Sequence, residues 1–233
     1  MAEPMRSDEE QIEAIKRWWE TNGNTTMGVV AALVIAYASW SWWTSSQASQ
    51  AQAASALYQT ALDGLTAGQP ADEESRATTA FIVAELKQDH AGSTYAYYGS
   101  SLVAAQAFEA GDLEQAAEEL EWLLEQNPEE PLVSASRIKL AQVRMDQNEL
   151  GKAKTAVSQG VVAEFAGMAA EIEGDIYYLE GDVKAAKSAY KRAIAASDMA
   201  ASRLITLKMN SVVVTSSEAK SEAGAPVATQ EES

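Results

Sequence analysis

The residue types that most enzymes use for catalysis are scarce in this chain of 233 residues. It contains no cysteine and one histidine, His90, which lies in the polar stretch QDHAGS. A single histidine without cysteine cannot build a metal site, and no HExxH motif, phosphate-binding glycine loop or nucleophile elbow occurs in the sequence. We therefore expect no catalytic residue, no metal, no cofactor and no enzymatic activity, and we expect His90 to lie in a surface loop.

Carboxylates could still perform acid–base chemistry, and five glutamates lie close together in the sequence: Glu114, Glu118, Glu119, Glu121 and Glu125. This spacing is more typical of the solvated side of a helix than of a catalytic carboxylate pair. The chain as a whole carries a net charge of −17. Because a nucleic-acid partner needs a basic surface opposite its phosphates, we expect no nucleic-acid binding.

A long uncharged stretch near the N-terminus predicts a membrane-spanning helix. No charged residue occurs between Glu20 and Asp63, and Thr25–Trp43 is apolar almost throughout. These residues would rise about 28 Å as a helix, close to the hydrocarbon thickness of about 30 Å. Tryptophans, which prefer the headgroup level, flank both ends of the stretch: Trp18 and Trp19 on one side, and Trp40, Trp42 and Trp43 on the other.

Two other interpretations of this stretch stay open. It could be a buried helix of a soluble core, or it could belong to a cleaved signal peptide, because Ala51-Gln52-Ala53 resembles a cleavage site. The stretch is longer than a usual signal-peptide core, and its aromatic end lies well upstream of that site. We therefore favour an uncleaved anchor.

Basic residues near the two ends of the span predict its orientation. Arg6, Lys16 and Arg17 precede it, whereas the first basic residue after it is Arg76. Since basic residues stay on the cytoplasmic side, residues 1–24 should be cytoplasmic, residues 25–43 should span the inner membrane once, and the remainder should be periplasmic.

Within the span, Gly28, Ala32 and Ala36 form a small-residue stripe that could pack against another membrane helix, or could reflect the abundance of alanine.

The region after the span contains internal repeats. Ala170–Ser197 fits the tetratricopeptide pattern with small residues at Gly174, Ala186 and Ala193, tyrosines at Tyr177 and Tyr190, and Gly181-Asp182 at the turn. Small residues allow the paired helices to cross closely, the tyrosines fill the gap beside them, and glycine accommodates the helix end.

Further copies lie upstream. The nearest copy has Leu140, Ala141, Ala153 and Val157 at the repeat positions, with Asn148 where the glycine would be. An earlier copy has Ala104, Phe108, Gly111-Asp112, Ala116 and Leu120. A degenerate copy has Ala77, Phe81 and Ala84, after a helix around Ser55–Leu65.

The fold class is therefore all-α, with an N-terminal transmembrane helix followed by a tetratricopeptide-like α-solenoid over residues 44–214. A capping helix over Ala200–Asn210 should turn Leu204, Leu207 and Ile205 inward, and residues 215–233 should form a disordered tail.

In such arrays the first helix of each pair lines a concave surface. Transferring those positions to this chain gives seven candidates for a peptide or partner groove: Tyr98, Phe108, Ile138, Gln142, Met145, Met168 and Tyr178. Aromatic and methionine side chains adapt well to varied apolar ligands, so this set predicts a groove for apolar peptide segments. The alternative is that several of these residues belong to the core between repeats.

The order of these features resembles a known family. The block EEQIEAIKRWWETNG, a single span, and a repeat domain ending near RLITLKMN are similar to the YfgM-like ancillary subunits of the SecYEG translocon, over roughly residues 7–210. The tail after Val214 departs from that pattern. The resemblance implies association with SecYEG and with the membrane-anchored periplasmic chaperone PpiD, and assistance to unfolded polypeptides as they emerge.

Two other functions stay open from the sequence. The chain could be a scaffold for envelope assemblies that binds one fixed partner, or a regulator that acts through its cytoplasmic segment Asp8–Glu20.

Overall fold

The computed structural model describes residues 8–66 and 72–222, and every regular element in these ranges is a helix. The chain divides into two compact units, residues 1–53 and 54–233. Helix α1 (Asp8–Thr66) makes up the described part of the first unit and supplies the first helix of the second. Among the described helices it alone is long and apolar enough to cross a membrane, and none of its apolar window is buried. This lack of burial argues against the core-helix alternative.

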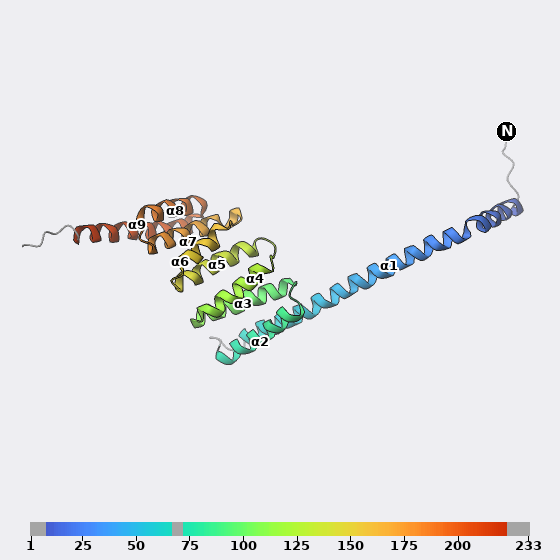
Figure 1. The fold of residues 1–233 in the computed structure, drawn as a ribbon, viewed down its shortest axis with the longest axis horizontal. Coiled ribbons are helices and arrows are strands. Elements are labelled where there is room, and N and C mark those ends of the chain that lie inside the picture. The colour runs from blue at the N-terminus through green and yellow to red at the C-terminus, as the bar shows by residue number, and fades with distance from the viewer. Residues whose placement is uncertain (1–7, 67–71, 223–233) are drawn as a thin grey trace, which may run out of the picture. The chain divides into compact units, whose positions relative to one another are not determined.

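The second unit is a succession of helical hairpins (Figure 1). After α1 come α2 (Glu73–Asp89), α3 (Thr94–Ala110), α4 (Leu113–Glu125), α5 (Leu132–Asp146), α6 (Leu150–Ser158), the short 3-10 turn η1 (Ala163–Phe165), α7 (Ala166–Leu179), α8 (Val183–Ala196) and α9 (Met199–Glu222). The closest pairs are α3 with α4, α5 with α6, and α7 with α8. The end of α1 packs on α2 through Ala54 and Ala61, which are fully buried beside Leu86 and Val83. The predicted solenoid of hairpins is confirmed.

The turn inside each of the last three hairpins has the same backbone form. Gly111, Asn148 and Gly181 adopt φ of 82°, 60° and 81°, the left-handed region that ends a helix. The residue after each glycine then caps the next helix: Asp112 accepts a hydrogen bond from the backbone N–H of Gln115, and Asp182 from that of Ala185. The positive φ of Asn148 confirms that it takes the place of the glycine, since asparagine tolerates this region better than most residues.

Small side chains allow the helices to approach one another. The positions predicted to be small in successive repeats, Ala116, Ala153, Ala186 and Ala193, are completely buried. Ala116 and Ala153 belong to a core cluster that extends from α3 to α7 and ends at Ile172 and Ile176. Ala186 and Ala193 belong to a second cluster, formed by α7, α8 and α9. Each cluster spans neighbouring helices, as nearest-neighbour stacking of repeats requires.

The capping helix differs from the sequence prediction in which side it buries. Leu204 and Leu207 are 65% and 66% exposed, so the prediction that they turn inward was wrong, whereas Ile205 is 2% exposed as expected. Ile205 packs in one cluster with Met209 and Val212. These three positions lie four and three residues apart, which places them on one face of a helix, and the two leucines fall beside that face.

Helix α9 is also longer than predicted. It continues to Glu222, through residues 215–222 that the sequence assigned to a disordered tail. Glu, Ala and Lys in this segment favour helix, which composition-based reasoning about disorder neglected. The remaining tail, residues 223–233, and residues 1–7 of the predicted cytoplasmic segment lie outside the described residues.

Candidate functional site

The first helices of two hairpins, α3 and α7, carry exposed apolar side chains at equivalent positions. Tyr98 and Phe108 on α3 are 46% and 40% exposed, and Met168 and Tyr178 on α7 are 46% and 40% exposed. The second pair repeats the first seventy residues later, as Gly181 repeats Gly111. We call the surface over α3, α5 and α7 that carries these four residues and Gln142 the groove face. Half-exposed aromatic and methionine side chains can lose further water-accessible area when they contact a ligand.

A cleft of about 170 Å³ lies between α3 and α5 on this face. It is lined by Ala104, Ala105, Phe108, Glu109, Leu120, Lys139, Gln142 and Val143. The structure thus brings together two of the predicted residues, Phe108 and Gln142, over a floor of small and aliphatic side chains. Lys139, which the sequence analysis did not single out, adds a cation to the rim.

Tyr98 lies in a different part of the groove face, beside a tyrosine that the sequence analysis missed. Its ring centroid is 6.2 Å from that of Tyr58, which in turn is 5.9 Å from Tyr95. Offset and tilted rings at such separations attract one another. The signal for Tyr58 was available, because it is the aromatic residue of the helix expected around Ser55–Leu65.

Two of the seven predicted groove residues are less exposed than the others. Ile138 is 6% exposed and belongs to the core cluster, and Met145 packs against that cluster. On α5 the exposed positions are Lys139, Gln142 and Asp146. One residue turns a helix by 100°, so the neighbour of Ile138, Lys139, lies on the exposed side. Met145 stands three residues before the turn residue Asn148, as Phe108 and Tyr178 stand before Gly111 and Gly181, but it is only partly exposed. For Ile138 the core alternative holds.

Ion pairs cross the α7 part of the face between Met168 and Tyr178. The ammonium of Lys208 on α9 lies 2.7 Å from Glu171 and 2.8 Å from Asp175. Burial opposes the charge on Lys208, but its bonds to these two carboxylates outweigh burial and raise its pKa. The hydroxyl of Tyr190 donates a hydrogen bond of 2.7 Å to Asp175, and this bond helps to hold the Asp175 carboxylate in its orientation.

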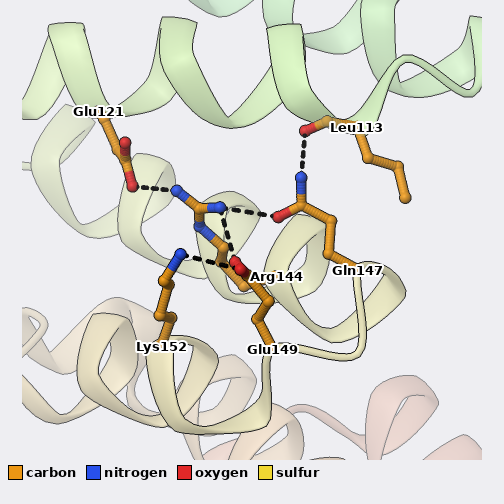
Figure 2. A network of polar contacts seen from close by, with 6 residues as sticks. All are labelled: Leu113, Glu121, Arg144, Gln147, Glu149 and Lys152. Atoms are coloured by element: carbon orange, nitrogen blue, oxygen red, sulfur yellow. Dashed lines mark hydrogen bonds and ion pairs between the residues drawn. The ribbon is translucent and has the colours of Figure 1, made fainter.

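A second cleft, of about 530 Å³, lies between α4, α5 and α6, and a polar network forms part of its wall (Figure 2). The guanidinium of Arg144 donates to Glu121, to Gln147 at 2.8 Å and to Glu149 at 2.7 Å. The amide of Gln147 donates to the backbone oxygen of Leu113 at 3.0 Å. The network joins two hairpins and holds its carboxylates in ion pairs, so it acts as a structural clamp.

The acidic run on α4 is only partly a solvated face. Glu114, Glu118 and Glu125 are exposed as expected. Glu119 instead receives two hydrogen bonds of 2.9 Å from Lys87, and its side chain is 16% exposed. With Glu121 also paired, the run contributes to the contacts between hairpins.

No group of three or more histidine, aspartate or glutamate side chains among the described residues is placed to hold a metal ion. His90 ends α2, where its backbone N–H donates to the oxygen of Leu86 at 2.9 Å. On α1, a Cβ placed on Gly28 would meet no atom within 4 Å, and Ala32 and Ala36 are exposed, so the packing role of this stripe stays a prediction.

Comparisons with known proteins agree with this architecture. The family model for the tetratricopeptide repeat-like domain matches residues 16–214. A protein of Haemophilus influenzae named ancillary SecYEG translocon subunit is 26% identical over 205 residues, covering 88% of this chain and 97% of the relative. A protein of Escherichia coli with the same name is 29% identical over 147 residues, covering 63% and 68%.

Among solved structures, the crystal structure of BtubC from P. vanneervenii aligns with a TM-score of 0.46 at 15% identity, covering 79% of this chain and 95% of that one. The family match includes the apolar part of α1 as well as the hairpins, and the names of the two curated relatives confirm the resemblance to the ancillary SecYEG translocon subunits. The chain therefore belongs to the tetratricopeptide repeat-like domain family, within which it is similar to the YfgM-like ancillary SecYEG translocon subunits.

Proposed function

We propose that this chain is an ancillary subunit of the SecYEG translocon that binds apolar segments of polypeptides as they emerge from the membrane. The names of the two curated relatives support the association with SecYEG. The groove face supports the binding activity. The periplasmic chaperone PpiD is a further partner in this proposal, on the strength of the family resemblance alone.

The observation that carries the proposal is the set of half-exposed apolar side chains on the groove face. Phe108 borders a cleft of about 170 Å³, a size suited to one aliphatic side chain. The side-chain amide of Gln142 can donate to and accept from a peptide backbone at the same place. Shallow sites of this kind bind many sequences weakly, which suits contact with an unfolded chain in transit.

The position of the anchor supports the same role. The apolar stretch Thr25–Trp43 would hold the protein in the inner membrane, and the basic residues before it favour a cytoplasmic N-terminus and a periplasmic repeat domain. Because the chain has no native cysteine, a single Ser188→Cys substitution on the exposed side of α8 gives one labelling site. A membrane-impermeant maleimide should label this cysteine in cells with a permeable outer membrane. If labelling occurred only after the inner membrane was opened, the repeat domain would be cytoplasmic and the proposed orientation would be wrong.

Binding to unfolded polypeptide tests the groove. The full chain, embedded in lipid nanodiscs, would be titrated with a fluorescent secretory protein kept unfolded by reduction and alkylation. Tyr98→Ser/Phe108→Ser/Tyr178→Ser should weaken binding by about tenfold or more, because it removes three large apolar contacts. The matched control is Phe81→Ser, at a 72% exposed phenylalanine on α2 outside the groove face. Equal affinity of the triple variant and the control would reject the groove.

A further inference from the structure

Among the residues that the structure describes, the last helix of the stack leaves an apolar face exposed. Terminal elements of repeat arrays normally turn a polar side outward, since no further repeat covers them. Helix α9 buries Ile205 and Val212, both 2% exposed, on its inner side. Its other side presents Leu204 and Leu207, which are about two-thirds exposed.

These leucines belong to a regular seam. Ala200, Leu204, Leu207 and Ser211 are all exposed and follow one another at spacings of four, three and four residues. That spacing is the narrow seam by which one helix packs against another. We call these four residues the outer seam. Because the inner seam of α9 packs on α8, the outer one is placed to accept one more helix on the end of the stack.

The segment that forms α8 and the first part of α9 has a charge opposite to that of the chain as a whole. Between Val183 and Val212 the sequence has one acidic residue, Asp198, in a chain of net charge −17. The same segment has six basic residues: Lys184, Lys187, Lys191, Arg192, Arg203 and Lys208. Arg203 is exposed and adjoins Leu204. Lys208 adjoins Leu207, but its ammonium is held by Glu171 and Asp175 of α7. A ligand that covers the seam would therefore meet the cation of Arg203 at one edge.

We propose that the outer seam docks an amphipathic helix of a partner protein that has leucine-type residues along its apolar stripe and carboxylates at the edges of that stripe. Each element follows from the seam: the stripe matches Leu204 and Leu207, and the acidic edge matches Arg203 and the net positive charge of the segment from Val183 to Val212. A second copy fits less well, because symmetric pairing of the same seam would bring the basic edges of the two copies together. A lipid surface fits less well too, because the seam is narrow and has no aromatic residue.

A designed peptide can test this docking on the full chain in nanodiscs of zwitterionic lipid. The probe is a fluorescent helix of three heptads with Leu at a and d and Glu at e and g, and its twin has Lys in place of Glu. Fluorescence anisotropy should show the acidic peptide binding about tenfold or more tightly than the basic one. Leu204→Gln/Leu207→Gln should remove this binding, and Arg203→Glu should reverse the preference between the two peptides. Phe81→Gln should leave both affinities unchanged.

Several other results of these experiments would contradict the docking proposal. Equal binding of the acidic peptide to the wild type and to the double leucine variant would overturn the proposal. So would a dimer in sedimentation that the double variant dissociates, or capture of anionic vesicles that depends on the same leucines. The variant Tyr98→Ser/Phe108→Ser/Tyr178→Ser should bind the acidic peptide normally, which separates failure of this interface from failure of the groove.

Discussion

Gly174 of α7 lies directly against the ring of Tyr190 of α8. A Cβ placed on Gly174 would stand 2.6 Å from Cδ1 and Cε1 of that ring, closer than any real Cβ contact. Tyr190 cannot easily move away, because it is 1% exposed and its hydroxyl donates to Asp175. The close crossing of the two helices therefore depends on the absence of a side chain at position 174.

Gly174→Ala should destabilise the repeat domain by about 1–3 kcal/mol, since overpacking of a well-filled core costs this much. Gly151→Ala is the matched control, because Gly151 is also helical and has no atom within 4 Å of an added Cβ. The control should gain up to about 1 kcal/mol from better helix propensity. Urea unfolding of the two variants measures the difference, and equal stabilities would contradict the packing argument.

Lys87 and Glu119 form a largely buried ion pair between α2 and α4. The side chains are 21% and 16% exposed, and Lys87 also lies 4.5 Å from the ring centroid of Trp122. Lys87→Met should cost about 2–4 kcal/mol, because it leaves the Glu119 carboxylate buried without its cation. Arg192→Met breaks the more exposed pair with Glu173. This substitution should lower the free energy of unfolding by no more than about 1 kcal/mol, because solvent screens exposed ion pairs. Thermal unfolding compares the variants, and a neutral Lys87→Met would show that water replaces the lysine.

The two sides of α9 should respond differently to substitution. Ile205→Ala should cost about 2–4 kcal/mol, because it opens a cavity beside α8. Leu204→Gln should change stability by no more than about 0.5 kcal/mol, because this side chain is mostly in water. Hydrogen exchange over Met199–Val212 should therefore accelerate in the first variant and stay as in the wild type in the second. The reverse pattern would mean that the helix packs by its other face.

The ion pairs of Glu149 give a pH-dependent contribution to stability. The hydrogen bond from Lys152 lowers the pKa of Glu149, against a smaller effect of burial and with further help from the charges of Lys152 and Arg144. A carboxyl with a lower pKa in the folded state stabilises the fold above its unfolded pKa, near 4.5. That contribution is lost as the pH falls through the folded pKa.

Melting temperatures of the wild type and Glu149→Gln, followed from about pH 7 to about pH 3, measure this contribution. The wild type should be the more stable at neutral pH, and the difference should shrink steadily below 4.5. A difference that stays constant across the range would assign the effect to packing instead of charge.

The repeat architecture could be predicted from the sequence because each of its features is local. Glycine and asparagine at positions 111, 148 and 181, aspartates after two of them, and small residues at fixed offsets specify the hairpins with little help from distant contacts. The pairing of a small residue at Gly174 with an aromatic residue at Tyr190 could be predicted because both occupy fixed positions within one repeat. The fold class followed directly from these spacings.

The faces of individual helices were harder to predict. Ile138 and Leu204 were placed on the wrong sides, because both helices carry apolar residues on more than one face and an error of one position turns a helix by 100°. Contacts between distant residues, such as Lys87 with Glu119 or Arg144 with Glu121, depend on how hairpins stack and leave no local signal.

Crosslinking to a translocating chain tests the central claim most directly. A photoreactive amino acid would replace Gln142 in the cleft, or Phe81 as the exposed control on α2, and a secretory protein would be stalled during translocation into inner-membrane vesicles. The account predicts adducts with the stalled chain from position 142 and few from position 81. Equal adducts from both positions, or none from position 142 while the stalled chain occupies SecYEG, would contradict it.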